Sequence, residues 1–443
     1  MLGGTGNAGQ SADLRNRLLY VLFILAVYRL GAHIPTPGVD TAALAEFFRS
    51  NANTLLGLFD MFSGRALSQF SIFAMGIMPY ISASIIVELL TVVVPHLGRL
   101  KKEGGQSGRR KLTQYSRYLT VALSLFQGYM LAVGLERMQF TGTSGAVLEP
   151  GLQFRLMTMV TLAAGTCFIM WLGEQITERG IGNGISIIIF AGIVDGLPSA
   201  IKGVFESVSS GDQTIIKMAV LVAGMLLIVG GVVFCERAQR RIPVNYSQRV
   251  VGNKIMGGRS THLPLKLNPA GVIPPIFASS LIMFPATIGQ FTDNPTILRM
   301  SEWVNSGSVL YNVLYVALII FFCYFYTGVQ FNPADVAENM QKHSGFVPGI
   351  RPGARTAEYI DRVLTRITLW GALYVSVICL LPSIVYRYFD VQFYFGGTAL
   401  LIVVGVALDT IGQIQSYLLN QQYDGFLKKG MSGIGRIQPR RRM

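Results

Sequence analysis

The residues of this chain that could carry enzymatic chemistry are few, and they form no recognisable catalytic pattern. Neither a phosphate-binding GxxxxGKS/T loop nor an HExxH zinc motif occurs. The glycine-rich run 179–184 precedes an apolar segment and has no strand before it, so it does not fit a dinucleotide-binding turn. The four histidines are scattered, and the four cysteines lack CxxC spacing and lie in apolar runs, which favours packing. We therefore expect no enzymatic activity, no cofactor and no metal.

Ionisable residues inside the long apolar runs are also rare. Glu88 and Asp409 are the main ones, and Arg29 lies near the end of a run. A proton- or ion-coupled carrier normally keeps such groups near the middle of the membrane. Glu88 lies close to the cytoplasmic end of its run, so we interpret it as a polar residue with a partner near the interface. A small-solute transporter remains the second hypothesis for this chain, and a membrane-embedded enzyme the third.

One nine-residue pattern occurs twice and is the strongest indication of a functional site. Residues 76–84 read GIMPYISAS and residues 271–279 read GVIPPIFAS, so both fit G-apolar-apolar-P-x-I-x-A-S. The copies fall in the second apolar run of each five-run half, and would therefore cross a membrane in opposite directions, as in inverted-repeat transport proteins. We predict that the prolines bend these helices and that isoleucines, Ile81 and Ile276 among them, line a gated path. Simple kinks in a packed bundle are the alternative.

Membrane-spanning helices are the elements that must position these residues. Hydrophobic residues make up 51% of the 443 positions and charged residues only 14%, too few to cover soluble domains with a polar surface. The apolar runs have about the 20 residues that a helix needs to cross a bilayer. Ten runs are predicted to span: 18–34, 72–94, 118–135, 153–173, 182–198, 215–234, 270–288, 309–329, 367–386 and 395–414. The predicted fold class is an all-α integral membrane protein with ten transmembrane helices in two inverted halves.

The net charge of +14 is compatible with nucleic-acid binding or with orientation in a membrane, and the position of the charges decides between them. With ten spans, and with Arg29 and Arg117 at span ends left out, 27 Lys and Arg residues fall on one side and 8 on the other. The positive-inside rule then places both termini in the cytoplasm. The basic loops 236–268 and 330–366 hold more charge than orientation needs, which favours a docking surface for large anionic partners over plain topology signalling.

The segment 55–70 lies between the first two spans and fits neither a span nor an ordinary loop. It reads LLGLFDMFSGRALSQF, which is interrupted by Gly57, Gly64 and Arg65 but is too apolar for water. A re-entrant segment that is buried within the protein fits this composition best.

Six stretches, in order along nearly the whole chain, carry a resemblance to a known family. They are residues 61–86, 101–118, 171–194, 260–280, 331–353 and 393–404. Together they resemble the bacterial SecY family, the channel-forming subunits of the Sec translocon. The resemblance implies two five-helix halves that close like a clam shell around an hourglass pore in the bacterial cytoplasmic (inner) membrane. Secretory polypeptides would cross through the pore, and hydrophobic segments would leave sideways into lipid.

The same resemblance assigns roles to particular residues. The aliphatic pore ring falls on Ile77, Ile81, Ile185, Ile189, Ile276 and Ile402. The plug that blocks the resting channel corresponds to 55–70, with Leu58, Phe59, Met61, Phe62, Ser63 and Gly64. The lateral gate, through which segments reach lipid, includes Pro79, Ser82, Ser84, Pro274, Ala278 and Ser279. The cytosolic docking surface includes Arg351, with Arg240, Arg241 and Lys266 as lesser candidates.

Partners and domain boundaries follow from the same comparison. The resemblance implies the membrane subunits SecE and SecG, the motor ATPase SecA, a ribosome whose rRNA meets the basic loops, unfolded polypeptides with their signal sequences, and lipids. The expected division of the chain is a cytoplasmic tail 1–17, a first half 18–200, a second half 201–418 and a basic tail 419–443. One departure is Glu88, which stands where the family pattern has an uncharged polar residue.

Overall fold

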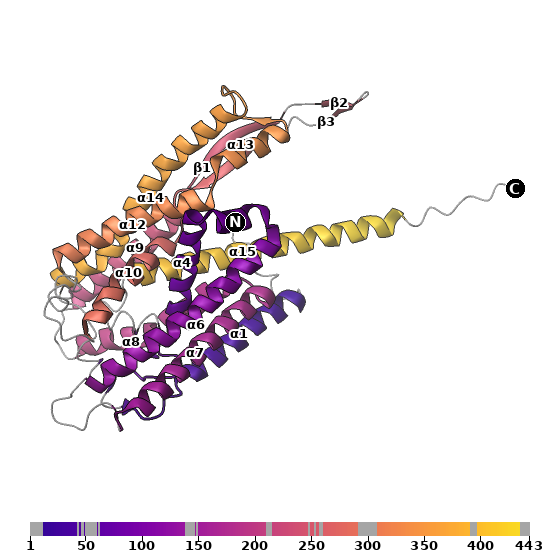
Figure 1. Cartoon of the computed structure of the whole chain (residues 1–443). Helices are drawn as coiled ribbons and strands as arrows, with labels where there is room; N and C mark the ends of the chain where they lie inside the picture. The colour runs from indigo at the N-terminus through magenta and orange to yellow at the C-terminus, as the bar shows by residue number, and fades with distance from the viewer. Residues whose placement is uncertain are drawn as a thin grey trace.

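The chain folds into a bundle of long helices with a small β-containing extension at one end, as the computed structural model in Figure 1 shows. The structure describes residues 12–41, 44–45, 48, 60, 63–137, 147, 149–209, 215–246, 249–251, 254–256, 260–290, 308–389 and 397–434. The predicted plug residues Leu58, Phe59, Met61 and Phe62 lie outside these ranges, as does most of 55–62.

Helices account for most of the described residues. Those of the first half are α1 (Ala12–Ala32), α4 (Met78–Val93), α5 (Pro95–Glu103), α6 (Gly105–Arg137), α7 (Leu152–Arg179) and α8 (Gly184–Ser209). Those of the second half are α9 (Ile215–Arg237), α10 (Ile273–Gln290), α12 (Val309–Gln330), α13 (Pro333–Lys342), α14 (Ala354–Phe389) and α15 (Gly397–Ile434). Each of the ten predicted spans falls on one of these helices, whereas α5 and α13 are additional short helices.

A criterion of helix length and hydropathy selects fewer membrane-spanning helices than the overlap with the ten predicted spans does. Among the described residues, α6, α7, α12, α14 and α15 include stretches that are long and apolar enough to cross a membrane. A sixth span arises if α4 and α5 count as one, although the chain bends by 104° between them. Shorter apolar stretches lie in α8 and α10, at Gly184–Gly196 and Ile273–Ile282. The predicted class, a helical membrane protein, is confirmed, while this criterion alone supports fewer than ten crossings.

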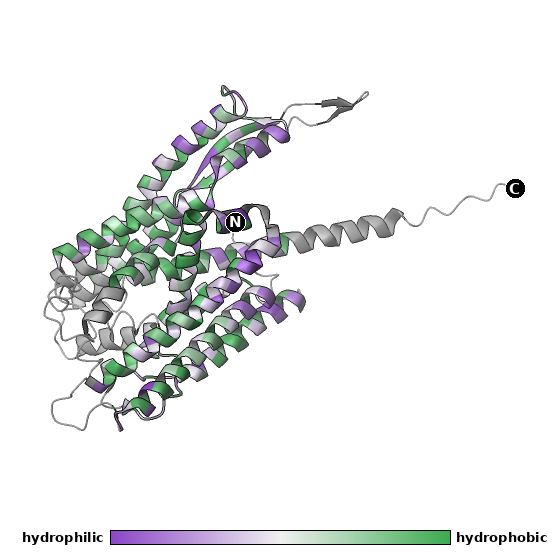
Figure 2. Ribbon diagram, viewed as in Figure 1, coloured by the Kyte–Doolittle hydropathy of each residue, from purple (hydrophilic) through white to green (hydrophobic). Residues whose placement is uncertain are grey.

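The outer surface of the bundle is apolar, as expected for contact with lipid. Leu226 and Leu227 on α9 are 70% and 76% exposed, and Val309 on α12 is 76% exposed. Figure 2 shows hydrophobic residues along the bundle and hydrophilic residues concentrated toward the ends of several helices and on the extension. Water would make so many exposed large apolar side chains unfavourable, whereas hydrocarbon removes that cost.

The helices pack as two groups that meet at a shared centre. In the first group α6 packs against α7 and α4, and in the second α12 packs against α10 and α14. The groups touch where α4 meets α10 and where α8 meets α15. At the edge of the bundle the Tyr417 hydroxyl of α15 donates to the Asp13 carboxylate of α1. That hydrogen bond lowers the pKa of Asp13, and the nearby Arg17 guanidinium adds to the effect.

The two basic loops form the extension and contain strands that the sequence pattern does not predict. Strand β1 (Gln239–Tyr246) pairs antiparallel with β4 (Ser260–Lys266) and with β5 (Gly345–Phe346). Strands β2 (Arg249–Val251) and β3 (Lys254–Met256) form a separate hairpin. A small core joins the three-stranded sheet to α13 and α14, and contains Ile242, Val244, Leu265, Met340, Val347 and Ile360. The loops 236–268 and 330–366, about 60 residues apart in the sequence, therefore fold together around one small core.

Candidate pore constriction and its surroundings

Both copies of the repeated pattern begin a helix, and they do so in the same way. Gly76 and Gly271 have positive φ angles of 54° and 64°, and α4 and α10 each start two residues later. Glycine adopts this conformation without the strain that a side chain would cause. Pro79 and Pro274 therefore lie in the first helical turn, where the backbone N–H would lack a partner in any case.

The prediction that these prolines bend membrane-spanning helices is therefore wrong. The predicted second span, 72–94, is helical only from Met78, and residues 72–77 form turns before it. The proline at the second helical position fixes where the helix starts and breaks no interior hydrogen bond. The sharp change of direction lies at the other end of α4, before Pro95.

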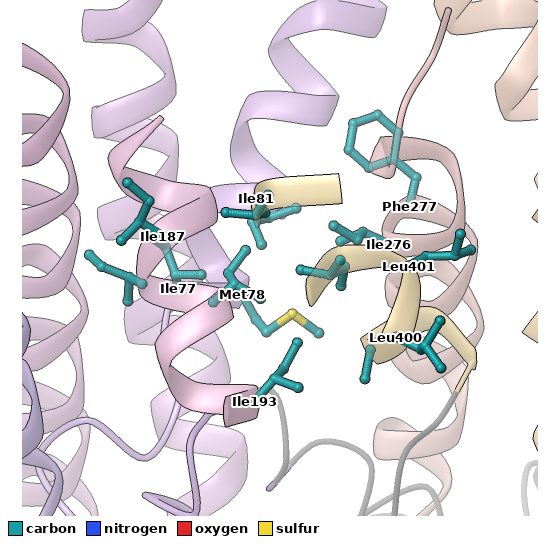
Figure 3. Close-up of a cluster of buried hydrophobic side chains, with 14 of the residues drawn as sticks. Ile77, Met78, Ile81, Ile187, Ile193, Ile276, Phe277, Leu400 and Leu401 are labelled. Carbon is teal, nitrogen blue, oxygen red and sulfur yellow. The ribbon is translucent and has the colours of Figure 1, made fainter. Parts of the chain in front are cut away.

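The two helix starts face each other across a small apolar cavity. Its lining comes from α4 and the residue before it, from α8 and from α10, and consists of Ile77, Met78, Ile81, Ile189, Ile276 and Ser279. The cavity has about 270 Å³ of space that atoms do not fill, part of it open to solvent. In Figure 3, Ile77, Met78 and Ile81 lie on one side and Ile276, Leu400 and Leu401 lie on the other.

The lining of this cavity is almost wholly apolar. Five of the six lining side chains are aliphatic or thioether groups that bind no ion or solute by hydrogen bonds. Ser279 is the exception, but its hydroxyl already donates to the Ile276 carbonyl at 2.9 Å. Water in so narrow an apolar passage makes few hydrogen bonds, so the constriction can close by dewetting.

The structure brings the predicted ring residues into one cluster but does not place all of them on the cavity. Ile77, Ile81, Ile189 and Ile276 line it and are each at most 8% exposed. Ile402 is 1% exposed and belongs to the surrounding core. Ile185 packs beside Gly173 of α7 rather than along the cavity. The assignment of all six to a ring therefore remains a prediction.

Met78 lines the cavity although the sequence analysis did not select it. It precedes Ile81 by three residues, which places both side chains on one helix face. Because Ile81 already marks that face, Met78 could have been selected from the sequence by its helical spacing from Ile81.

Helices α4 and α10, the predicted lateral gate, are in contact. Ala278 of this predicted gate is fully buried. The repeat extends to the hydroxyls, since Ser84 donates to the Ile81 carbonyl at 2.9 Å, as Ser279 does to that of Ile276. The other predicted gate residues, Pro79, Pro274 and Ser82, are buried or half-buried.

Glu88 near the end of α4 has a partner, as its sequence position suggested. The Lys101 Nζ atom of α5 lies 3.1 Å from its Oε1 atom, and both side chains are 34% exposed. The ion pair spans the sharp bend between the two helices, so it joins the end of α4 to α5.

The described end of the segment 55–70 is buried between helices and does not cross the bundle. Ser63 is 1% exposed, and its hydroxyl donates to the Asp60 carbonyl at 2.9 Å and accepts from the Leu67 backbone N–H. Gly64 has a φ angle of 67°. These two are the predicted plug residues that the structure describes.

The predicted docking residues lie on the β-containing extension or beside it. Arg240 and Arg241 are exposed on β1, and Lys266 ends β4 opposite Gln239. Lys266 Nζ also lies 3.5 Å from Asp409 Oδ1 of α15, where both side chains are largely exposed. Arg351 is exposed in the turn before α14, and its carbonyl accepts from the Thr356 hydroxyl. The fold therefore gathers the basic loops on one projecting surface.

A helical bundle with a lipid-compatible exterior and an aliphatic constriction between its two halves defines a membrane channel. Residues 71–411 match the SecY family. The "Protein translocase subunit SecY" of Escherichia coli strain K12 is 52% identical over 433 residues, 97% of each chain. The chain belongs to the SecY family.

Solved structures with low sequence identity to this chain share its fold. A structure described as that of a protein conducting channel aligns with a TM-score of 0.65 at 16% identity, covering 90% of this chain and 91% of that one. The Sec61 channel of a canine ribosome-channel complex aligns with a TM-score of 0.59, also at 16% identity, covering 90% and 91%. At such low identity these likenesses show the shared architecture.

Proposed function

We propose that this chain is the central subunit of a protein-conducting channel, through which secretory polypeptides cross the bacterial cytoplasmic membrane. Hydrophobic segments of those polypeptides leave between α4 and α10 into lipid, because an apolar helix partitions into hydrocarbon and a polar chain does not. The observation that carries the proposal is the aliphatic cavity between the two helix starts, lined from both halves of the molecule.

The six isoleucines form the pore ring in this proposal, and the segment 55–70 is the plug. The halves 18–200 and 201–418 move apart to open the channel, while both termini stay in the cytoplasm in accordance with the charge distribution. SecE and SecG complete the membrane complex. A signal sequence together with SecA or a ribosome opens it, with docking at Arg351, Arg240, Arg241 and Lys266.

Crosslinking of a stalled secretory polypeptide tests this proposal. In a chain whose four cysteines are replaced by serine, an Ile189→Cys variant should crosslink to the stalled client, because Ile189 lines the cavity. A Val160→Cys variant is the matched control, since Val160 on α7 is 57% exposed on the apolar exterior and should not crosslink. No crosslink at position 189, or equal crosslinks at both, would contradict the proposal. Solute uptake without any ATPase would instead indicate a small-solute transporter.

A further inference from the structure

Glu88 places a carboxylate on the same face of α4 as the cavity residue Ile81. The two residues are seven positions apart, which is two helical turns, so their side chains leave the helix on the same side. At a rise of 1.5 Å per residue, Glu88 lies about 10 Å farther along the helix axis. A segment that lies along α4 and reaches the cavity therefore passes Glu88.

The charge of Glu88 is balanced by a side chain from outside α4. Lys101 of α5 reaches back across the sharp bend, and its Nζ atom lies 3.1 Å from Glu88 Oε1. Both side chains are partly exposed, and pairs of this kind form and break at a small cost in free energy. Lys101 therefore marks the place that a cation takes beside Glu88, and another cation can replace it there.

The surroundings of Glu88 include the second half of the bundle. Its carboxylate interacts electrostatically with Tyr326 of α12. The Tyr326 ring packs edge-on against Phe277 of α10, with the ring centroids 6.4 Å apart. Phe277 follows the cavity residue Ile276, and Figure 3 shows both opposite Ile81. Glu88 thus lies beside the seam where α4 meets α10.

The side chains around Glu88 on this end of α4 are apolar and accessible. Leu90, Val92 and Val93 are large hydrophobic residues with exposed side chains. This end of the helix therefore offers an apolar surface with one carboxylate. The complementary segment is an apolar helix that carries a lysine or an arginine at the level of Glu88.

We infer that Glu88 is a specificity-determining residue that receives one lysine or arginine of an entering polypeptide, beside its apolar segment, in exchange for Lys101. The inference rests on the proposed function, in which apolar segments leave between α4 and α10. The exchange keeps the carboxylate paired throughout, so no charge is left alone at the seam. Arginine should be received better than lysine, because a guanidinium can bind both carboxylate oxygens.

Two secretory reporters that differ in one residue test this inference. They share one apolar segment, with either arginine or serine beside it, and the readout is the ratio of their crosslinks to cysteine at position 189. Glu88→Gln should lower the arginine-to-serine ratio by about threefold, a factor within reach of a partly exposed ion pair. Lys101→Gln should instead raise the ratio, because it removes the competing cation. A purely structural ion pair predicts the same effect from both variants, since either one breaks it.

A charge reversal and a matched control complete the experiment. Glu88→Lys should favour a reporter with aspartate at the tested position over the arginine reporter. Glu174→Gln should leave the ratio unchanged, because Glu174 pairs with Arg117 between α7 and α6 and does not line the cavity. Both reporters are compared in the same variant, so a lower amount of folded channel cancels from the ratio.

The possible failures of the inference and of the proposed function are distinct. If Glu88→Gln and Lys101→Gln shift the ratio in the same direction, or if neither shifts it, the inference is wrong. Normal crosslinking of the unaltered chain at position 189 would then still support the channel. If the unaltered chain gives no crosslink to either reporter, the proposed function fails and the role of Glu88 fails with it.

Discussion

Ile81 and Ile276 occupy equivalent positions of the repeat, and each is 8% exposed beside the central cavity. Burial of one such side chain stabilises the closed packing by about 1.5–3 kcal/mol relative to exposure. The side chains offer no hydrogen bond to a passing polypeptide, so they can contact many sequences and still exclude water when they close. In the proposed channel, sealing and tolerance of many polypeptide sequences thus come from the same chemical property.

Replacing both Ile81 and Ile276 with glycine should raise resting ion conductance. The two changes widen the narrowest apolar part of the passage, which lets water and ions persist there. Conductance of proteoliposomes measures the effect. Ile319→Gly is the control, because Ile319 on α12 is fully buried but does not line the cavity. Equal conductance in the double variant and the unaltered chain would count against the ring.

At the scale of elements, α4 and α10 each begin just after a glycine, and neither is kinked by its proline. Gly76 and Gly271 have positive φ angles just before the helices, and the prolines that follow fit the first turn of α4 and α10. The cavity lies at these two helix starts. At the other end of α4 the chain bends by 104°, and Pro95 begins the next helix, α5.

A Gly271→Ala variant should lower thermal stability. No heavy atom lies within 4 Å of a Cβ atom at Gly271, so the cost arises from its positive φ angle and amounts to about 1 kcal/mol. In a chain of this length that corresponds to a decrease in Tm of roughly 1 °C. Gly328→Ala on α12 has equally open space in ordinary helical backbone, and should be neutral or stabilising. Tm values of the purified proteins in detergent that show the opposite order would exclude the backbone explanation.

For the whole molecule, the main division is between an apolar bundle and a basic extension. The extension has its own small core of residues from both loops, and its strands β1 and β4 lead directly into α9 and toward α10. A protein that binds the extension would therefore act on a body that is continuous with the second half of the bundle. The concentration of hydrophilic residues there is visible in Figure 2.

If SecA docks at Arg351 as proposed, an Arg351→Ala variant should weaken its binding by about tenfold, the effect expected on removal of one central charged contact. The effect should shrink at high ionic strength, since salt screens the attraction between exposed charges. Affinity is measured for the purified complex at two salt concentrations. Arg362→Ala is the control, because Arg362 is exposed on α14 but already pairs with Glu358. Unaltered affinity of the Arg351 variant would rule this docking site out.

The sequence by itself determined the membrane class, the positions of the apolar helices and the repeated pattern, because hydropathy and local motifs act over a few turns of chain. The repeat marked Ile81 and Ile276, and the family resemblance added Ile77 and Ile189; all four line the cavity. Even Glu88 was correctly expected to have a partner, since its position near the end of an apolar run demands one.

Tertiary structure alone decided which of those residues meet. It placed Ile185 against α7 instead of the cavity, paired Arg29 with Asp195 of a distant helix, and built a sheet from two separate loops. It also decided that the repeat prolines lie in the first turns of helices. The sequence around a proline can look the same at a helix kink and in a first turn, so the local pattern does not distinguish the two. These outcomes depend on contacts between segments far apart in the chain, which no local pattern specifies.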